Sequence, residues 1–225
     1  MIETISLTAS LLALFISGLT AWLTLLKRGV VKMTRPTVIF LGPDMPKNPN
    51  KRPQPKVYFR TLLFSTSKRG SVIENIFVTL EKAGGTENFS IWVHETGKML
   101  RGAGLFVPET GIEATHQFIR HESDSDFYFS EGTYRLKVFG HMLNAAEPYL
   151  LFSEDLKITS EVTKEMVDPL TGVYFDWEPH SRVYLEHIDR FQPCCGSTKI
   201  LIKTRESLTC RFLELLLNNY RTASF

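Results

Sequence analysis

Charged side chains are missing from a long stretch near the N-terminus, residues 5–26. Residues Ile5 to Leu26 form a run of 22 residues without one acidic or basic side chain. The hydrocarbon core of a bilayer is crossed by about 20 apolar residues in a helix. A cleaved signal peptide has a basic start, a shorter apolar core and a small-x-small cleavage site, whereas this chain opens with Glu3, its apolar run is too long, and Lys27 and Arg28 follow it. The run therefore predicts one transmembrane helix within an anchor over residues 1–28.

Cysteine is scarce and is absent before residue 194. The three cysteines are Cys194, Cys195 and Cys210, an odd number with two of them adjacent. Small secreted domains carry paired cysteines that form a disulfide framework, so this pattern favours a cytoplasmic domain. Asn88-Phe89-Ser90 has the form of a glycosylation sequon and points the other way, but a three-residue match is common by chance.

The sequence also lacks the strong catalytic and nucleotide-binding motifs. It contains no G-x-S-x-G elbow, no phosphate-binding G-x-x-x-x-G-K-[ST], no H-E-x-x-H and no paired C-x-x-C. Basic and aromatic residues alternate over Lys56–Arg60, which fits one strand with an inward apolar face better than a nucleic-acid surface. We therefore predict no catalytic residue, no cofactor, no bound metal and no nucleic-acid partner.

One region supports an enzyme as an alternative. The Glu178–Asp189 region gathers carboxylates and imidazoles that could surround a metal ion: Glu178, His180, Glu186, His187 and Asp189. Against this, we expect the six histidines to be solvated surface side chains, because their spacing is not that of a zinc site. An acidic tract, consisting of Glu122, Asp124, Asp126 and Glu131, is likewise expected to be a solvated loop instead of a calcium site.

Acidic residues are rare just after the apolar run, where basic residues gather. Four basic residues follow it closely, namely Lys27, Arg28, Lys32 and Arg35, and no basic residue precedes it. Because basic residues beside a span stay on the cytoplasmic side, the bulk of the chain is predicted to be cytoplasmic. The same four residues are candidates for contact with an anionic membrane surface, although a stop-transfer signal and a solvated linker would have this composition too.

Small residues recur along one face of the predicted membrane helix. The spacing alternates between four and three and gives a helix-packing face of Ser6, Ser10, Ala13, Ser17, Thr20 and Thr24. Membrane helices associate through close approach across small side chains, so the face predicts a membrane-protein partner or a homo-oligomer. Chance is the alternative, because Ser, Thr, Ala and Gly also occur off this face.

The rest of the chain has the pattern of short strands. From Lys56 to Thr159, runs rich in β-branched and aromatic residues alternate with turn residues at intervals of eight to twelve, which is typical of an antiparallel β-sandwich. We expect a basic, proline-rich juxtamembrane segment with one strand over residues 29–55 and the sandwich over residues 56–190. Residues 191–225 are expected to form a tail with a short C-terminal helix.

One nonapeptide resembles a known structural motif. Ser130 to Val138 (SEGTYRLKV) is similar to the tyrosine corner of immunoglobulin-like sandwiches, with Gly132 in the turn and Tyr134 sending its hydroxyl back to the preceding chain. The resemblance implies an immunoglobulin-like fold, in a mainly β protein with an N-terminal transmembrane α-helix. It implies no activity, because such folds host many unrelated functions.

Together these patterns predict a single-pass, membrane-anchored binding and assembly module that is not an enzyme. Its predicted partners are the lipid bilayer and a membrane protein or a second copy of the chain. Two alternatives stay open: an extracytoplasmic adhesion or carrier domain on a membrane anchor, and a metal-dependent enzyme that uses the Glu178–Asp189 region.

Overall fold

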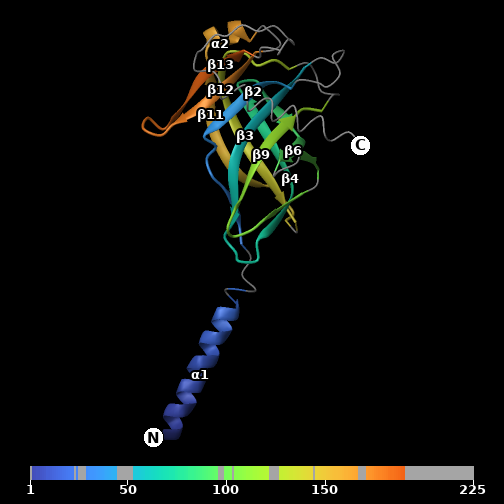
Figure 1. Cartoon of the computed structure of the whole chain (residues 1–225). Coiled ribbons are helices and arrows are strands. Elements are labelled where there is room, and N and C mark those ends of the chain that lie inside the picture. Colours follow the sequence, from blue (N-terminus) through green and yellow to red (C-terminus); the bar gives the residue numbers. More distant parts are fainter. Residues whose placement is uncertain are drawn as a thin grey trace, which may run out of the picture. The chain divides into compact units, whose positions relative to one another are not determined.

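The structure is a computed structural model of the whole chain. It describes residues 2–22, 24, 29–44, 53–95, 99–102, 104–121, 127–143, 145–166 and 171–190. The described part is mainly β, with one long helix near the N-terminus and one short helix after the eleventh strand (Figure 1). The predicted tail and its C-terminal helix, residues 191–225, lie outside the described residues.

Helix α1 (Ile2–Ala21) carries the long apolar run. Residues Thr4–Ala21 are long and apolar enough to cross a membrane, and none of this span is buried inside the protein. Its large apolar side chains are exposed, including Leu11, Leu14 and Phe15 at about 60–70% of their surface. An apolar helix without protein cover is stable in water only if something else removes that surface from solvent.

The strands form two antiparallel sheets. The first sheet has the order β13-β12-β2-β3-β9-β6-β7, with β1 paired to β3, and the second has the order β11-β10-β4-β5, with β8 paired to β4. The strands are β1 (Val31–Met33), β2 (Val38–Asp44), β3 (Gln54–Ser65), β4 (Ser71–Lys82), β5 (Gly85–Phe89), β6 (Ile91–Glu95), β7 (Met99–Arg101), β8 (Leu105–Val107), β9 (Ile112–Ile119), β10 (Gly132–Met142), β11 (Tyr149–Ile158), β12 (Thr171–Glu178) and β13 (Val183–Arg190).

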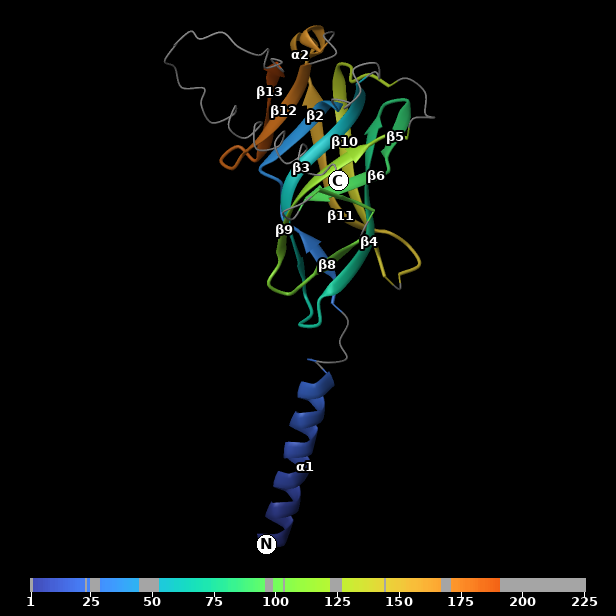
Figure 2. The same cartoon turned by 45° about the vertical axis from the view of Figure 1, so that its right-hand side comes forward.

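The core lies between the two sheets. Strands β3 and β10 alternate buried and more exposed residues, as expected where one sheet face packs inward and the other meets solvent. Figures 1 and 2 show β2, β3 and β9 in one layer and β10 and β11 in the other. The largest buried side chains come from both layers, among them Phe59, Phe118, Tyr134, Leu136 and Phe175. At about 2 kcal/mol or more for each such side chain, this layer is the main source of stability.

The sandwich begins earlier in the sequence than predicted. β1 and β2, which lie in the expected juxtamembrane segment 29–55, pair with β3 and join the first sheet. Ile39 and Leu41 of β2 are fully buried in the core. The one strand predicted in this segment corresponds to β2, and β1 is a second strand that the sequence did not indicate. The first sheet therefore begins at Val31, before the predicted start of the sandwich at residue 56.

Short helix α2 (Ser160–Glu165) follows β11. The side chain of Thr159 accepts the N–H of Val162 at its N-terminus, and Val162 is buried against the core. Capping of this kind satisfies a backbone donor that the first helical turn leaves without a partner. The sequence predicts this helix over residues 161–167, and the cap explains its start.

Candidate functional site

A pocket of about 560 Å³ opens at one end of the sandwich. It is formed by the segment before β1, the turn between β3 and β4, strand β8 and the turn between β10 and β11. Its lining includes Val30, Val72, Phe106, Leu143 and Tyr149. All five of these side chains are exposed. The volume lies within the range of pockets that hold small ligands, about 300–1,000 Å³.

The segment that leads into β1 is fixed to the turn after β3. Val30 N–H donates to the Thr66 hydroxyl at 2.8 Å, and Thr66 N–H donates to the Val30 carbonyl at 3.0 Å. Gly29 approaches this turn so closely that a Cβ on it would lie 2.4 Å from the Cβ of Ser67. Only glycine fits there, so the wall of the pocket is set by a close backbone approach.

Gly70 and Phe106 form a further part of the pocket lining. Gly70 has a φ of 70°, a region that favours glycine, and a Cβ on it would lie 2.6 Å from the Phe106 ring. The turn is closed by a hydrogen bond from Gly70 N–H to the Ser67 carbonyl at 3.0 Å. The Phe106 ring therefore packs on the backbone of the β3–β4 turn at Gly70, where it lines the pocket.

An irregularity in β4 exposes another lining residue. The pairing of β10 with β4 shifts between His141, opposite Asn75, and Met142, opposite Ile73, which leaves Glu74 as an extra residue. Such a bulge reverses the alternation of the strand, so Ile73 is buried and Val72 faces outward. Leu143 N–H donates to the Val72 carbonyl at 2.9 Å, and this bond holds the turn between β10 and β11 against β4.

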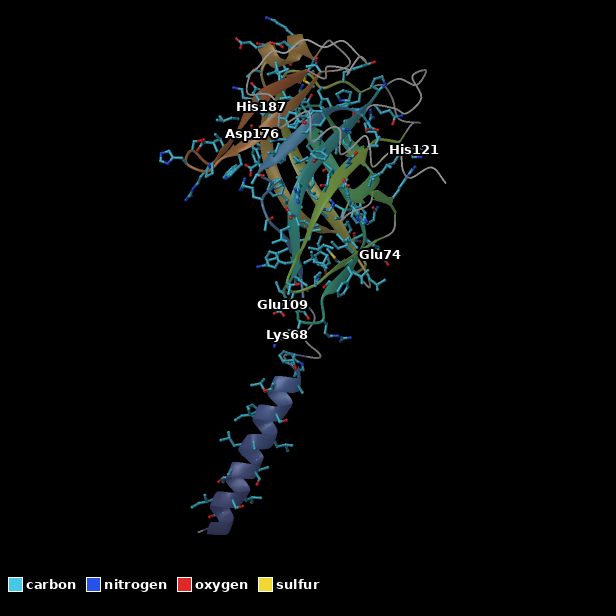
Figure 3. The ribbon with its side chains drawn as sticks, viewed as in Figure 1. Lys68, Glu74, Glu109, His121, Asp176 and His187 are labelled. Atoms are coloured by element: carbon cyan, nitrogen blue, oxygen red, sulfur yellow. The ribbon has the colours of Figure 1, made fainter. Side chains whose placement is uncertain are left out.

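Charged residues lie around this end of the sandwich. Lys32, Lys68 and Arg69 are exposed basic residues, and Arg69 lines the pocket. Figure 3 shows Lys68 and Glu109 at the same end, whereas Asp176 and His187 lie at the opposite end of the sandwich. Glu74 is engaged by His141, whose Nδ1 is 2.9 Å from its Oε2.

The predicted membrane-surface basic residues have different surroundings. Lys27 and Arg28 lie outside the described residues, and Lys32 is exposed on β1. Arg35 instead forms an ion pair with Glu154, and its guanidinium lies 3.9 Å from the centre of the Trp177 ring. These contacts join the start of the sandwich to β11 and β12, so they give Arg35 a packing role within the domain.

The predicted helix-packing face lies along α1, with Thr24 just beyond its last residue. Its hydroxyls donate to backbone carbonyls of the preceding turn: Ser10 to Ser6, Thr20 to Ile16 and Thr24 to Thr20, at 2.7–2.9 Å. Hydroxyl groups that are satisfied in this way need no partner across an interface. The face therefore consists of small side chains, three of which have their hydroxyls bonded to the backbone carbonyls of the preceding turn, and this suits close approach of a second helix.

The tyrosine corner residues are in direct contact with the turn before β10. Ser130 N–H donates to the Tyr134 hydroxyl at 2.8 Å, and that hydroxyl lies 3.0 Å from the Ser130 carbonyl, to which it donates. Gly132 has a φ of 138°, which favours glycine. Tyr134 itself is 1% exposed.

The Glu178–Asp189 region forms the hairpin of β12 and β13, and its side chains serve other contacts. Glu178 accepts the His180 N–H at 3.0 Å, and Glu186 accepts the Thr159 N–H at 3.1 Å. The His187 ring pairs with Asp176 at 2.9 Å. Successive residues of a strand point to opposite faces, so Glu186 and His187 diverge. Within the described part of the chain, no three His, Cys, Asp or Glu side chains lie together in a way that could hold a metal ion.

Two histidines were wrongly expected at the surface. His94 on β6 and His116 on β9 are 2% and 1% exposed, and they pair directly across the two strands. Trp92 Nε1 donates to His116 Nδ1 at 3.1 Å, which places the imidazole proton on Nε2. Burial lowers the pKa of both rings, that of His116 to about 3 with a further contribution from His94. Both are therefore neutral core side chains at neutral pH.

Comparison of the chain with protein-family models, with curated proteins and with solved structures finds no match.

Proposed function

We propose that this chain is a single-pass membrane protein in which α1 anchors a non-catalytic, immunoglobulin-like binding domain at the cytoplasmic face of a membrane. Its partner is another membrane protein or a second copy of the chain. The observation that carries this proposal is the bare apolar surface of α1, of which no part between Thr4 and Ala21 is buried by the protein. Lipid covers such a surface without any partner from the chain itself.

The strand order supports the immunoglobulin-like assignment. In that fold one sheet has the order A-B-E-D and the other contains G-F-C, extended by C′ in variable-type domains. Taking β2 as A, the sheet order β2-β3-β9-β6 corresponds to A-B-E-D and β11-β10-β4-β5 to G-F-C-C′. Tyr134 then lies near the start of strand F, the position of the tyrosine corner, and bonds back to Ser130. β12 and β13 extend the first sheet beyond strand A.

The binding role rests on the combination of anchor and sandwich. Loops at the ends of a sandwich are held by a rigid scaffold and commonly form recognition surfaces. A tether raises the effective concentration of any partner in the same membrane. Lys27, Arg28 and Lys32 after the apolar run support the cytoplasmic orientation.

Extraction of membranes tests the anchor. The full chain is expected to stay in the membrane pellet after alkaline carbonate and to be released by detergent. Leu14→Arg places a charge at the middle of α1, at a cost of about 3 kcal/mol of insertion free energy, and should shift the chain toward the soluble fraction. Leu185→Arg, at an exposed position of β13, is the matched control and should leave extraction unchanged. Release of the unaltered chain by carbonate alone would refute the anchor.

An extracytoplasmic adhesion or carrier domain is the second candidate. Asn88 of the sequon is exposed on β5, so a glycosylating enzyme would meet no steric barrier there. A glycosidase-sensitive gain in mass that disappears in Asn88→Gln would favour this candidate over the cytoplasmic domain.

A further inference from the structure

We propose that the pocket between the β3–β4 and β10–β11 turns binds an anionic phospholipid of the membrane that holds α1. This inference rests on the proposed anchoring by α1, and it names a partner that the anchor alone does not imply. It is independent of whether the protein partner is a second copy or another membrane protein.

The covalent chain keeps the pocket close to the bilayer. α1 ends at Ala21 and Gly29 lines the pocket. The seven residues 22–28 allow a separation of at most about 29 Å between these two residues when fully extended. The pocket is therefore within reach of the headgroups that surround the end of α1, whatever path the connecting residues take.

The rim of the pocket is apolar and exposed. Val30, Phe106, Leu143 and Tyr149 are each about half exposed. They come from three segments that are far apart in the sequence, and they lie around one opening. Soluble surfaces rarely gather large apolar side chains in this way, and such patches mark sites for lipids, ligands or proteins. Side chains of this kind suit the boundary between headgroups and acyl chains.

Basic residues outnumber acidic residues around this rim. Lys32, Lys68 and Arg69 are exposed there, and Lys27 and Arg28 directly precede the first lining residue in the sequence. The acidic residues nearby are Glu74, which lies beside His141, Glu109 of the β8–β9 turn and Glu147 of the β10–β11 turn, so the five basic residues outnumber three acidic ones. An apolar opening with a positive margin complements an anionic phospholipid, whose phosphate lies just outside its acyl chains.

A lipid is also the ligand that the tether makes most abundant. The proposed anchor holds the domain beside the headgroups of the bilayer, and their high effective concentration favours occupancy of the pocket by mass action. A second copy or a protein segment would have to compete with that local concentration.

Hydrogen exchange on the full chain in lipid nanodiscs tests the proposal. One set of nanodiscs contains phosphatidylcholine alone, and a second contains about 30% phosphatidylserine. Peptides over residues 66–72 and 142–150 are expected to exchange at least about threefold more slowly with phosphatidylserine, and high salt should reverse much of the difference. Peptides over β12 and β13 should exchange equally in both.

Matched variants separate the pocket from general electrostatics. Lys68→Glu removes a basic residue of the rim and Leu143→Glu places a charge in the opening, so both should abolish the difference between the two lipids. Lys157→Glu and Leu185→Glu make the same changes at exposed positions away from the pocket and should preserve it.

Three results would overturn the proposal. Equal exchange of the pocket peptides in both lipids, with the chain firmly inserted, would refute the lipid site and leave the anchor intact. Protection that depends on the ratio of protein to lipid and ignores lipid charge would indicate a second copy in the pocket. A chain that fails to enter the nanodiscs at all would refute the anchor and, with it, the lipid site.

Discussion

The hydroxyl of Tyr134 bonds to both backbone groups of Ser130, and this contact sets the turn into β10. Tyr134→Phe removes the hydroxyl while its buried ring position stays filled. We expect a loss of about 1–2 kcal/mol in the free energy of unfolding, because one donor and one acceptor lose their partner. Denaturant unfolding of the purified chain in detergent, followed by tryptophan fluorescence, measures this loss. Tyr128→Phe alters a largely exposed tyrosine and should cost less than about 0.5 kcal/mol.

The buried pair of His94 and His116 makes stability depend on pH. In the unfolded chain both rings bind a proton near pH 6.5, whereas in the folded chain burial lowers the pKa of both and holds that of His116 at about 3. Between these values the unfolded state binds more protons, so stability falls as the pH falls. For His116 the loss approaches about 1.4 kcal/mol for each pH unit between about 6.5 and about 3, and His94 contributes in the same direction.

Unfolding between pH 7 and pH 4.5 tests this dependence. His116→Gln keeps an acceptor for Trp92 Nε1 and removes the titrating ring, so the slope of stability against pH should become clearly shallower. His180→Gln changes an exposed histidine in the β12–β13 turn and should keep the original slope. An unchanged slope in His116→Gln would contradict the assignment of the pH dependence to the buried pair.

The sequence alone predicted that the Tyr134 hydroxyl bonds back to the preceding chain, but it did not predict that His94 and His116 are buried. The contact of Tyr134 is local, within four residues, so a nonapeptide contains the information. His94 and His116 become neighbours only through the pairing of β6 with β9. A weak signal existed, because Trp92 and His94 are two residues apart and therefore point to the same face of a strand. Without knowing which face was inward, polarity alone placed the imidazoles at the surface.

The predicted helix-packing face, Ser6, Ser10, Ala13, Ser17 and Thr20 of α1 with Thr24 just beyond it, is a testable interface. The triple variant Ser10→Leu, Ser17→Leu and Thr24→Leu fills the face with larger side chains. We expect association with a partner helix to weaken by about tenfold, since close approach of the backbones is lost. Energy transfer between labelled chains in vesicles, or recovery of a co-purified protein, measures it.

The control for this variant keeps the added bulk and moves it off the face. Thr8→Leu and Gly18→Leu are both located off this face of α1. A Cβ added at Gly18 would have no other atom of the chain within 4 Å. These changes should preserve association. Equal weakening by both variants would mean that the small-residue face has no special role.

Strands with regular alternation were predicted more reliably than those with irregularities. The sequence predicts strands at Lys56–Ser67, Ile112–Arg120, Thr133–His141 and Tyr149–Thr159, and β3, β9, β10 and β11 begin and end within about two residues of these bounds. It gives β4 as one unbroken alternation, whereas Glu74 bulges out and reverses the faces of Val72 and Ile73. A bulge depends on the partner strand, which the local pattern does not reveal. The bulge also exposes Val72, which lines the pocket, so the local sequence pattern did not indicate this part of the site.

The edge strand β13 was missed for a related reason. Its exposed residues include Val183 and Leu185, so its outward face is apolar and the usual contrast between faces is weak. The charged and imidazole side chains between them suggested a metal site instead. In the structure they bond along the hairpin and to the start of α2.

On the scale of the whole molecule, α1 ends at Ala21 and β1 begins at Val31, so only nine residues separate the apolar helix from the first strand of the sandwich. The pocket at that end is assembled from segments around residues 30, 70, 106 and 145. No local pattern predicts such a convergence, because it depends on the order of the strands in both sheets. The apolar run and the basic residues after it, in contrast, are properties of the sequence itself and define the predicted membrane orientation.

Labelling of the sandwich on intact cells tests the central claim most directly. Ser90→Cys places a thiol at an exposed position between β5 and β6, in a chain whose Cys194, Cys195 and Cys210 are replaced by serine. A membrane-impermeant maleimide is expected to leave this thiol unlabelled until the membrane is permeabilised, while the chain remains in the membrane fraction. Full labelling on intact cells, or a chain recovered without any membrane, would contradict the account.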